Sequence, residues 1–130
     1  MYSHLSTLNL TEETHHLVNE KRMKMMPGKK GGIVCGNHII NCARGGIVDE
    51  DALLEALEAG TIASAALDVF EIEPVPANAP LIQHENFHGT PHIGAATLEA
   101  QHRVGIDIAQ EVITALKGQK PTTLVNSKFL

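Results

Sequence analysis

Residues 39 to 70 of this 130-residue chain, IINCARGGIVDEDALLEALEAGTIASAALDVF, carry the clearest pattern of alternating secondary structure. The stretch starts with β-branched residues, passes through DALLEALEA (51 to 59), and ends in an apolar segment from Ile62 to Phe70. Asp49 is suited to cap a helix over the middle part, because its carboxylate can accept the first unpaired backbone N–H groups, and Gly60 can end that helix in a left-handed turn. Strand, helix and strand in this order predict two parallel strands joined by a helical crossover.

The same alternation extends upstream. Leucines alternate with serine and threonine over residues 1 to 10, which predicts a short strand that ends at Thr11. Asn19 is a good cap for a helix over EKRMKMM (20 to 26). Pro27-Gly28 should end that helix, since proline restricts the residue before it and glycine permits the left-handed turn.

The segment GKKGGIVCGNH (28 to 38) brings a second β-branched run close to the first. Ile33-Val34 and Ile39-Ile40 are both suited to a strand, yet only one of them is needed in the core of the sheet. Two such runs could permit two strand registers in this region. We interpret GKKGG as a solvated turn, because it lacks the G-x-x-x-x-G-K spacing of a phosphate-binding loop.

Downstream, a proline-rich loop (Glu71 to Pro80) precedes a last short strand, Asn86 to Thr90. Thr97 is placed to cap a long helix that ends at Gly118 and Pro121. An apolar stripe with helical spacing, which predicts ordinary packing of that helix, is formed by Ala109, Val112, Ile113 and Leu116. Alternating strands and helices predict an α/β fold in which helices cover a parallel sheet. The chain is 43% hydrophobic, so we expect residues 1 to 130 to form one domain.

Composition argues against several classes of partner. The net charge is -5 and the ten basic residues are scattered, so the chain has no basic patch for nucleic acid. Its longest apolar stretch is too short to cross a bilayer, and its first residues lack the pattern of a signal peptide, which favours a cytoplasmic protein without a membrane partner. Cys35 and Cys42 are the two cysteines, and we expect free thiols in a reducing compartment.

Charged side chains and a histidine follow three of the predicted strands. Arg44 follows Ile39 to Asn41, Asp68 and Glu73 follow the apolar segment, and His92 follows the last strand. Because the carboxyl ends of parallel strands meet at one edge, these side chains could converge in one crevice. A guanidinium matches a carboxylate in a planar fork, and a histidine held by a carboxylate can take a hydroxyl proton near neutral pH. The set predicts an enzyme that binds an acid and moves its proton.

Two of these carboxylates have alternative interpretations. Glu71 competes with Glu73 as the group that supports His92, since alternation along an extended segment would put both on one face. Asp68 could instead cap a turn at the end of its strand.

Eight histidines raise the question of a metal site. The candidate ligands do not form paired short motifs, and neighbours along a strand point to opposite faces. We therefore expect no metal at the two candidate sets, which are Cys35, His38 and Cys42, and His84 with His88.

Several long motifs occur in a characteristic order. They are LTEET (10 to 14), INCARGGIVDE (40 to 50), AALDVFEIEP (65 to 74), TPHIGAATLEAQ (90 to 101) and LVN (124 to 126). Through them the chain resembles the NAD-dependent D-2-hydroxyacid dehydrogenases, most closely the D-3-phosphoglycerate dehydrogenases. The resemblance implies that residues 1 to 130 are the second half of a cofactor domain, a partial Rossmann-like parallel sheet flanked by helices. It also implies hydride transfer between a D-2-hydroxy acid and NAD.

The resemblance assigns roles to individual residues. Arg44 would bind the substrate carboxylate and carbonyl, and His92 would take the C2 hydroxyl proton as hydride leaves for NAD. Glu73, which the E-x-E-P pattern selects over Glu71, would hold His92 and tune its charge. Contacts with the cofactor would come from Cys42, Ala43, Arg44, Asp68, His92 and Gly94. The favoured substrate is 3-phosphoglycerate, which implies a place in serine biosynthesis.

One feature of the family is missing. The chain contains no G-x-G, so it lacks the glycine-rich loop that seats a dinucleotide pyrophosphate. We expect a homodimer or a complementary chain to be a partner beside the small-molecule D-2-hydroxy acid. The alternative hypothesis is a catalytically inactive, truncated relative that acts as an interaction or oligomerisation module.

Overall fold

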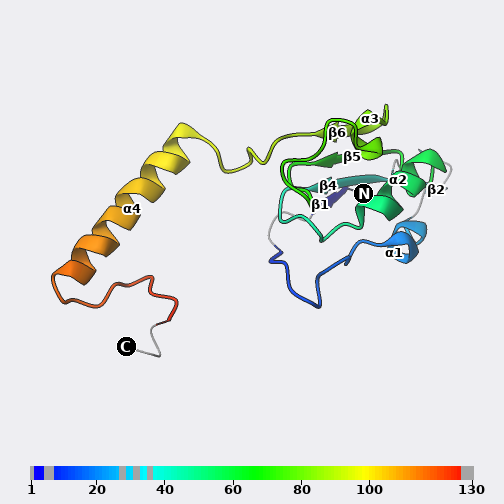
Figure 1. Ribbon diagram of the computed structural model, residues 1–130. Coiled ribbons are helices and arrows are strands. Elements are labelled where there is room, and N and C mark those ends of the chain that lie inside the picture. The colour runs from blue at the N-terminus through cyan, green and yellow to red at the C-terminus, as the bar shows by residue number, and fades with distance from the viewer. Residues whose placement is uncertain (1, 5–7, 27–28, 31–32, 35–36, 127–130) are drawn as a thin grey trace. The chain divides into compact units, whose positions relative to one another are not determined.

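The computed structural model describes residues 2–4, 8–26, 29–30, 33–34 and 37–126 (Figure 1). They fall into two compact units, Met1–Ile93 and Gly94–Leu130. The first unit contains a parallel sheet with its helices, and the second contains one long helix. Each unit is described by itself below.

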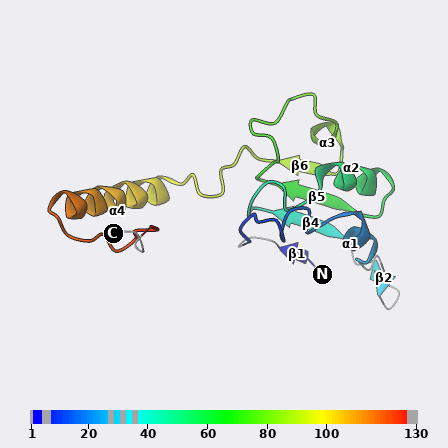
Figure 2. The ribbon, with the colours of Figure 1, turned by 60° about the horizontal axis from the view of Figure 1, so that its bottom comes forward.

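The first unit is built on a four-stranded sheet. Its strands lie in the order β1 (Tyr2–His4), β4 (His38–Asn41), β5 (Ser64–Leu67) and β6 (Phe87–Gly89), as Figure 2 shows from one edge to the other. All three pairings are parallel. The predicted α/β class, a partial Rossmann-like parallel sheet with helices, is therefore confirmed.

Helix α2 (Glu50–Glu58) forms the predicted crossover between β4 and β5. The Asp49 side chain accepts a hydrogen bond of 3.0 Å from the Ala52 N–H at its start, and Gly60 follows its end with a φ of 68°. The cap and the helix, which depend on local hydrogen bonds and on an apolar face, are both confirmed.

Helix α1 (Glu20–Lys24) is also capped as predicted, because Asn19 accepts a hydrogen bond from the Arg22 N–H. It is shorter than the predicted span of 20 to 26. The predicted helix end at Pro27-Gly28 lies outside the described residues.

The core lies between the strands and three helices. Alternate residues of β4 and β5 are buried, and the apolar ones among them belong to one cluster together with side chains from α1, α2 and α3 (Pro80–Gln83). Since residues that alternate along a strand share one face, the three helices cover the same face of the sheet. The cluster includes Met23, Ile39, Leu53, Leu57, Ala65, Leu67, Leu81 and Phe87.

Two strand predictions need correction. The first strand is Tyr2–His4, and no strand ends at Thr11, because residues 8 to 11 are irregular and residues 12 to 16 form a turn. Threonine hydroxyls there bind backbone groups of the same segment, and this local competition removes those groups from a ladder. Strand β5 is shorter than the segment Ile62 to Phe70, although the flanking Ile62, Val69 and Phe70 remain buried.

The two β-branched runs lie in different sheets. Ile39-Ile40 lies in the core strand β4, whereas β3 (Ile33–Val34) pairs in an antiparallel hairpin with β2 (Lys29–Lys30). This hairpin is a separate two-stranded sheet. Of the GKKGG segment, only the two lysines are described, so our interpretation of it as a solvated turn falls mostly outside the described residues.

The second unit is dominated by α4 (Leu98–Leu116), which the Thr97 side chain caps through the Ala100 N–H at 3.1 Å. Gly118 follows the helix end with a φ of 73°, as predicted. The stripe from Ala109 to Leu116 lies on this helix, but none of its members is buried. The expected packing of the stripe is therefore not found among the described residues. No helix in the described part of the chain is long and apolar enough to cross a membrane.

Candidate functional site

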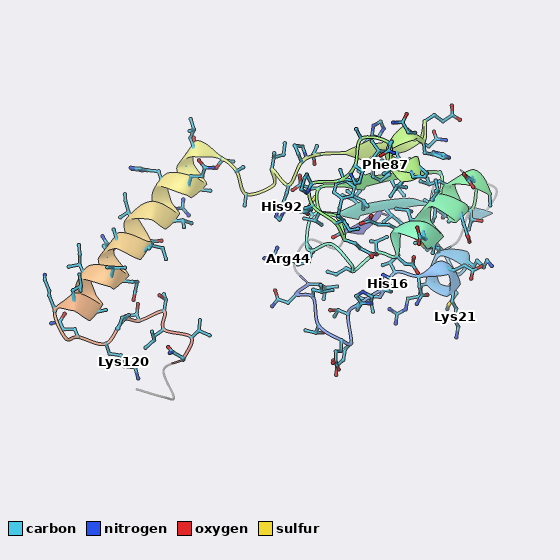
Figure 3. The ribbon with its side chains drawn as sticks, viewed as in Figure 1. His16, Lys21, Arg44, Phe87, His92 and Lys120 are labelled. Atoms are coloured by element: carbon cyan, nitrogen blue, oxygen red, sulfur yellow. The ribbon has the colours of Figure 1, made fainter. Side chains whose placement is uncertain are left out.

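The predicted site residues follow strands that end at the same edge of the sheet. In the parallel register, Asn41 at the end of β4 pairs with Leu67 of β5, and Leu67 pairs with Gly89 of β6. The loops after these strands therefore leave the sheet together, where open α/β sheets place their ligand sites. Figure 3 shows Arg44 and His92 on this side of the sheet.

The centre of the site is a histidine–carboxylate pair. Nδ1 of His92 lies 2.8 Å from Oε2 of Glu73, and the other oxygen, Oε1, accepts a hydrogen bond of 2.9 Å from the Phe70 N–H. The hydrogen bond from His92 is the main reason why the pKa of Glu73 is lowered, and the Phe70 N–H acts in the same direction. The side chains of His92 and Glu73 are 49% and 37% exposed, so a ligand can reach the pair.

The backbone at His92 is held in an unusual conformation. His92 has a φ of 54°, in the left-handed region that non-glycine residues rarely adopt, and its N–H donates to the Thr90 carbonyl at 3.0 Å. Such conformations cost free energy and gather at functional sites, where the surrounding structure maintains them.

The buried side chain of Asp68 stabilises this turn through hydrogen bonds. The residue is 5% exposed, and its Oδ1 accepts hydrogen bonds from the Thr90 hydroxyl at 2.5 Å and from the Ile93 N–H at 2.8 Å. These two donors flank His92, so Asp68 sets the position of the imidazole. The interpretation of Asp68 as the cap of a turn agrees with these contacts.

Asn41 shapes the loop that carries Arg44. Its side chain is buried, its Oδ1 accepts from the Ala43 N–H, and its Nδ2 donates to the Arg44 carbonyl, both at 2.9 Å. Arg44 is exposed, and its Nη1 donates to the Ala43 carbonyl at 2.6 Å. It forms no ion pair with a described carboxylate. The guanidinium is therefore available for an anionic ligand.

Gly45 brings the arginine loop against the glutamate loop. A Cβ atom at Gly45 would lie 1.9 Å from the carbonyl oxygen of Phe70 and 2.9 Å from the Glu71 nitrogen. Only a residue without a side chain permits this backbone approach. The contact joins Arg44, next to Gly45, to the loop in which the Phe70 N–H holds Glu73.

The sequence prediction named most, but not all, of these residues. Cys42 is exposed and Ala43 is buried in the arginine loop, and Gly94 is the first residue of the second unit. Asn41, Gly45 and Thr90 were not predicted as site residues. An asparagine at a strand end before a turn, a glycine pair, and a threonine before proline are the signals that could have identified them.

A pocket of about 430 Å³ lies beside the histidine–carboxylate pair. Its lining is mostly apolar apart from the pair itself, and it consists of Phe70, Glu73, Pro74, Val75, Pro91 and His92. A largely apolar hollow with a few polar groups at its margin is the usual form of a small-molecule site.

The fold and this edge define the class of the molecule: part of a Rossmann-like α/β domain, with a histidine, a carboxylate and an arginine at the carboxyl ends of its parallel strands. The family model for the D-isomer specific 2-hydroxyacid dehydrogenase, NAD binding domain, matches residues 5–94. The chain belongs to this family, as its motifs predicted.

Individual relatives support the assignment. The chain is 48% identical over 121 residues to a glyoxylate reductase of Thermofilum pendens, covering 93% of this chain and 34% of that protein. It is 47% identical over 123 residues to D-3-phosphoglycerate dehydrogenase 3 of Arabidopsis thaliana, covering 95% and 20%. The crystal structure of the TT0316 protein from Thermus thermophilus superimposes with a TM-score of 0.84 at 36% identity, covering 95% of this chain and 37% of that one. The chain thus spans about a third or less of the length of these two curated relatives.

Proposed function

We propose that this chain is the part of an NAD-dependent D-2-hydroxyacid dehydrogenase that carries the proton-transfer pair, with 3-phosphoglycerate as the favoured substrate. The observation that carries the proposal is the contact of 2.8 Å between His92 and Glu73 on a strained turn at the carboxyl edge of the sheet. The names of two relatives, a glyoxylate reductase and a phosphoglycerate dehydrogenase, support the substrate class. Serine biosynthesis in the cytoplasm stays a prediction.

In this proposal His92 is the acid–base group. With Nδ1–H donating to Glu73, Nε2 has the free electron pair that takes the proton of the C2 hydroxyl during oxidation. The carboxylate of Glu73 stabilises the imidazolium that forms. In the reverse direction the imidazolium returns the proton to the oxygen of the 2-oxo acid.

Arg44 is proposed to bind the substrate carboxylate. Its exposed guanidinium follows β4 at the same edge, and two parallel N–H···O hydrogen bonds would orient the acid. Such orientation places the C2 hydroxyl toward the imidazole and lowers the entropic part of the barrier.

NAD, when bound, supplies the hydride acceptor at its nicotinamide ring. The groups at this edge fit that chemistry, because the Arg44 guanidinium forms no ion pair with a described carboxylate and the half-exposed imidazole of His92 lines a mostly apolar pocket. We assign the cofactor contacts to Cys42, Ala43, Arg44, Asp68, His92 and Gly94. In the same proposal, residues 1 to 130 form one partial cofactor domain, and a complementary chain supplies the glycine-rich loop that a second copy of this chain would also lack.

Calorimetric titration of the folded chain with NADH tests the proposal. Saturable binding is expected, and Asp68→Asn should weaken it while keeping an oxygen for the Thr90 and Ile93 donors. Asp51→Asn removes the same charge from an exposed position on α2 and serves as the matched control. If the folded chain does not bind NADH, alone or mixed with a polypeptide that carries the glycine-rich loop, the dehydrogenase role fails. The inactive interaction module would then be favoured.

A further inference from the structure

The LTEET motif has no role in the site described above, yet it forms a well-ordered turn. The Thr14 hydroxyl donates to the Asn9 carbonyl at 2.7 Å, and the Thr11 N–H donates to the Thr14 hydroxyl at 2.8 Å. The His15 N–H closes the turn on the Thr11 carbonyl at 2.9 Å. The next residue, His16, has a φ of 48°, so the turn directs this side chain at the cost of backbone strain.

His16 lies between two carboxylates. Its Nε2 is 2.9 Å from Oε1 of Glu71, and its Nδ1 is 3.5 Å from Oδ2 of Asp49. Its N–H donates to the Gly46 carbonyl at 2.7 Å. Three contacts, two of them through the ring, therefore join the LTEET turn to the loops that follow β4 and β5.

The carboxylate that His16 binds, Glu71, belongs to the same loop as Glu73, which contacts His92. Glu71 lies two residues before Glu73, and its N–H donates to Oε1 of Glu50 at 2.7 Å. The preceding residue, Phe70, donates its N–H to Glu73 and has its carbonyl against Gly45. These contacts hold the backbone of the loop at Phe70 and Glu71. The contact with His16 holds the side chain of Glu71 in the same loop.

We propose that His16 is a positioning residue for the proton-transfer pair: by binding Glu71 and Asp49 it holds the loop that presents Glu73 to His92. The inference rests on the proposed function of that pair. The side chain of His16 is 34% exposed, and it contacts Asp49, Glu71 and the ring of His15, which is stacked at a centroid distance of 3.9 Å. Three further charged residues, Glu13, Lys21 and Arg22, line the same pocket as His16. An exposed ion pair contributes little to overall stability, so the effect of His16 should be local.

The test follows the pKa of the Glu73 carboxyl by carbon-13 NMR in the full chain and in two variants. His16→Asn keeps a residue that tolerates the left-handed conformation but is too short to reach Glu71. Glu71→Ala removes the other partner. If His16 positions the loop, both variants loosen the hydrogen bonds to Glu73, and its pKa rises toward the ordinary carboxyl range in each.

The two variants separate positioning from a simple change of charge. Removing the negative charge of Glu71 would by itself lower the pKa of Glu73, which is opposite to the expected rise. His15→Gln removes the same type of ring one residue away and should leave the pKa of Glu73 unchanged. Amide NMR spectra establish that each variant is folded.

Three results would overturn the proposal: a lowered pKa of Glu73 in Glu71→Ala, an equal rise in His15→Gln, or global unfolding of both variants. Unfolding would make His16 part of the general scaffold. The readout needs no cofactor, so it is separate from the NADH titration. Failure to bind NADH would refute the dehydrogenase role and leave the geometric result standing.

Discussion

Replacement of Gly45 by alanine should destabilise the first unit, because this glycine allows two loops of the site to touch through their backbones. The added methyl carbon would lie 1.9 Å from the Phe70 carbonyl oxygen, about 1.5 Å closer than the 3.4 Å at which ordinary contact begins. The backbone of Gly45 and that of Phe70 must move apart. We therefore expect the loss in free energy of unfolding to lie toward the upper part of the range of about 1–3 kcal/mol that overpacking causes. For a unit of this size, about 2 kcal/mol lowers the melting temperature by roughly 8–16 °C.

Thermal unfolding followed by circular dichroism measures this effect, with the pKa of Glu73 as a second readout. The methyl should push the Phe70 loop away and weaken its N–H bond to Glu73, so we expect that pKa to rise. Gly105→Ala is the matched control, since no atom lies within 4 Å of a Cβ there and alanine favours a helix by about 1 kcal/mol. If Gly45→Ala melts at the wild-type temperature, the close approach of the two loops is wrong.

Three further predictions concern single side chains. Asn41→Asp replaces the amide group that donates to the Arg44 carbonyl by an acceptor. We expect the free energy of unfolding, measured with urea, to fall by about 1–3 kcal/mol. A decrease below roughly 0.5 kcal/mol would contradict this account. Burial raises the pKa of Glu50, so its charged form opposes folding as pH rises through that pKa. Glu50→Gln keeps an oxygen for the Glu71 N–H and should melt higher than wild type at pH 7, with the difference vanishing in acid. The lowered pKa of Glu73 means that its ionised form stabilises the fold above the ordinary carboxyl range, and that this contribution is lost as pH falls through the lowered pKa. Wild type should therefore be more stable than Glu73→Gln at neutral pH, and their melting temperatures should converge in acid; a constant gap would refute the assignment.

The helices and their caps could be predicted from the sequence because their determinants are local. Asp49, Asn19 and Thr97 each accept a hydrogen bond from an N–H within three residues, and each was predicted as a cap. The order of the sheet strands and of α1, α2 and α4 was predicted for the same reason, since turn residues and apolar periodicity lie along the chain. The short helix α3 and the β2–β3 hairpin were not predicted. The first strand was placed too late because threonine hydroxyls, which the periodicity does not represent, close the LTEET segment into a turn.

The site could be predicted only as a set of residue types in a characteristic order. Arg44, Glu73 and His92 follow strands, and the parallel topology brings their loops to one edge. Which carboxylate binds His92 could not be decided by alternation along the chain, because Glu71 and Glu73 have the same periodicity. In the structure Glu73 binds His92 while Glu71 binds His16.

The α/β class, the helix caps and the residues from which a dehydrogenase site can be built could all be predicted from the amino-acid sequence, because they depend on neighbours in the chain and on family motifs. Tertiary structure alone decided which groups meet. The Asp68 oxygen binds two donors beside His92, and the Gly45 backbone contacts Phe70, across separations of more than 20 residues along the chain. Such contacts depend on the three-dimensional packing of loops from different strands, and no local pattern specifies the distance between them.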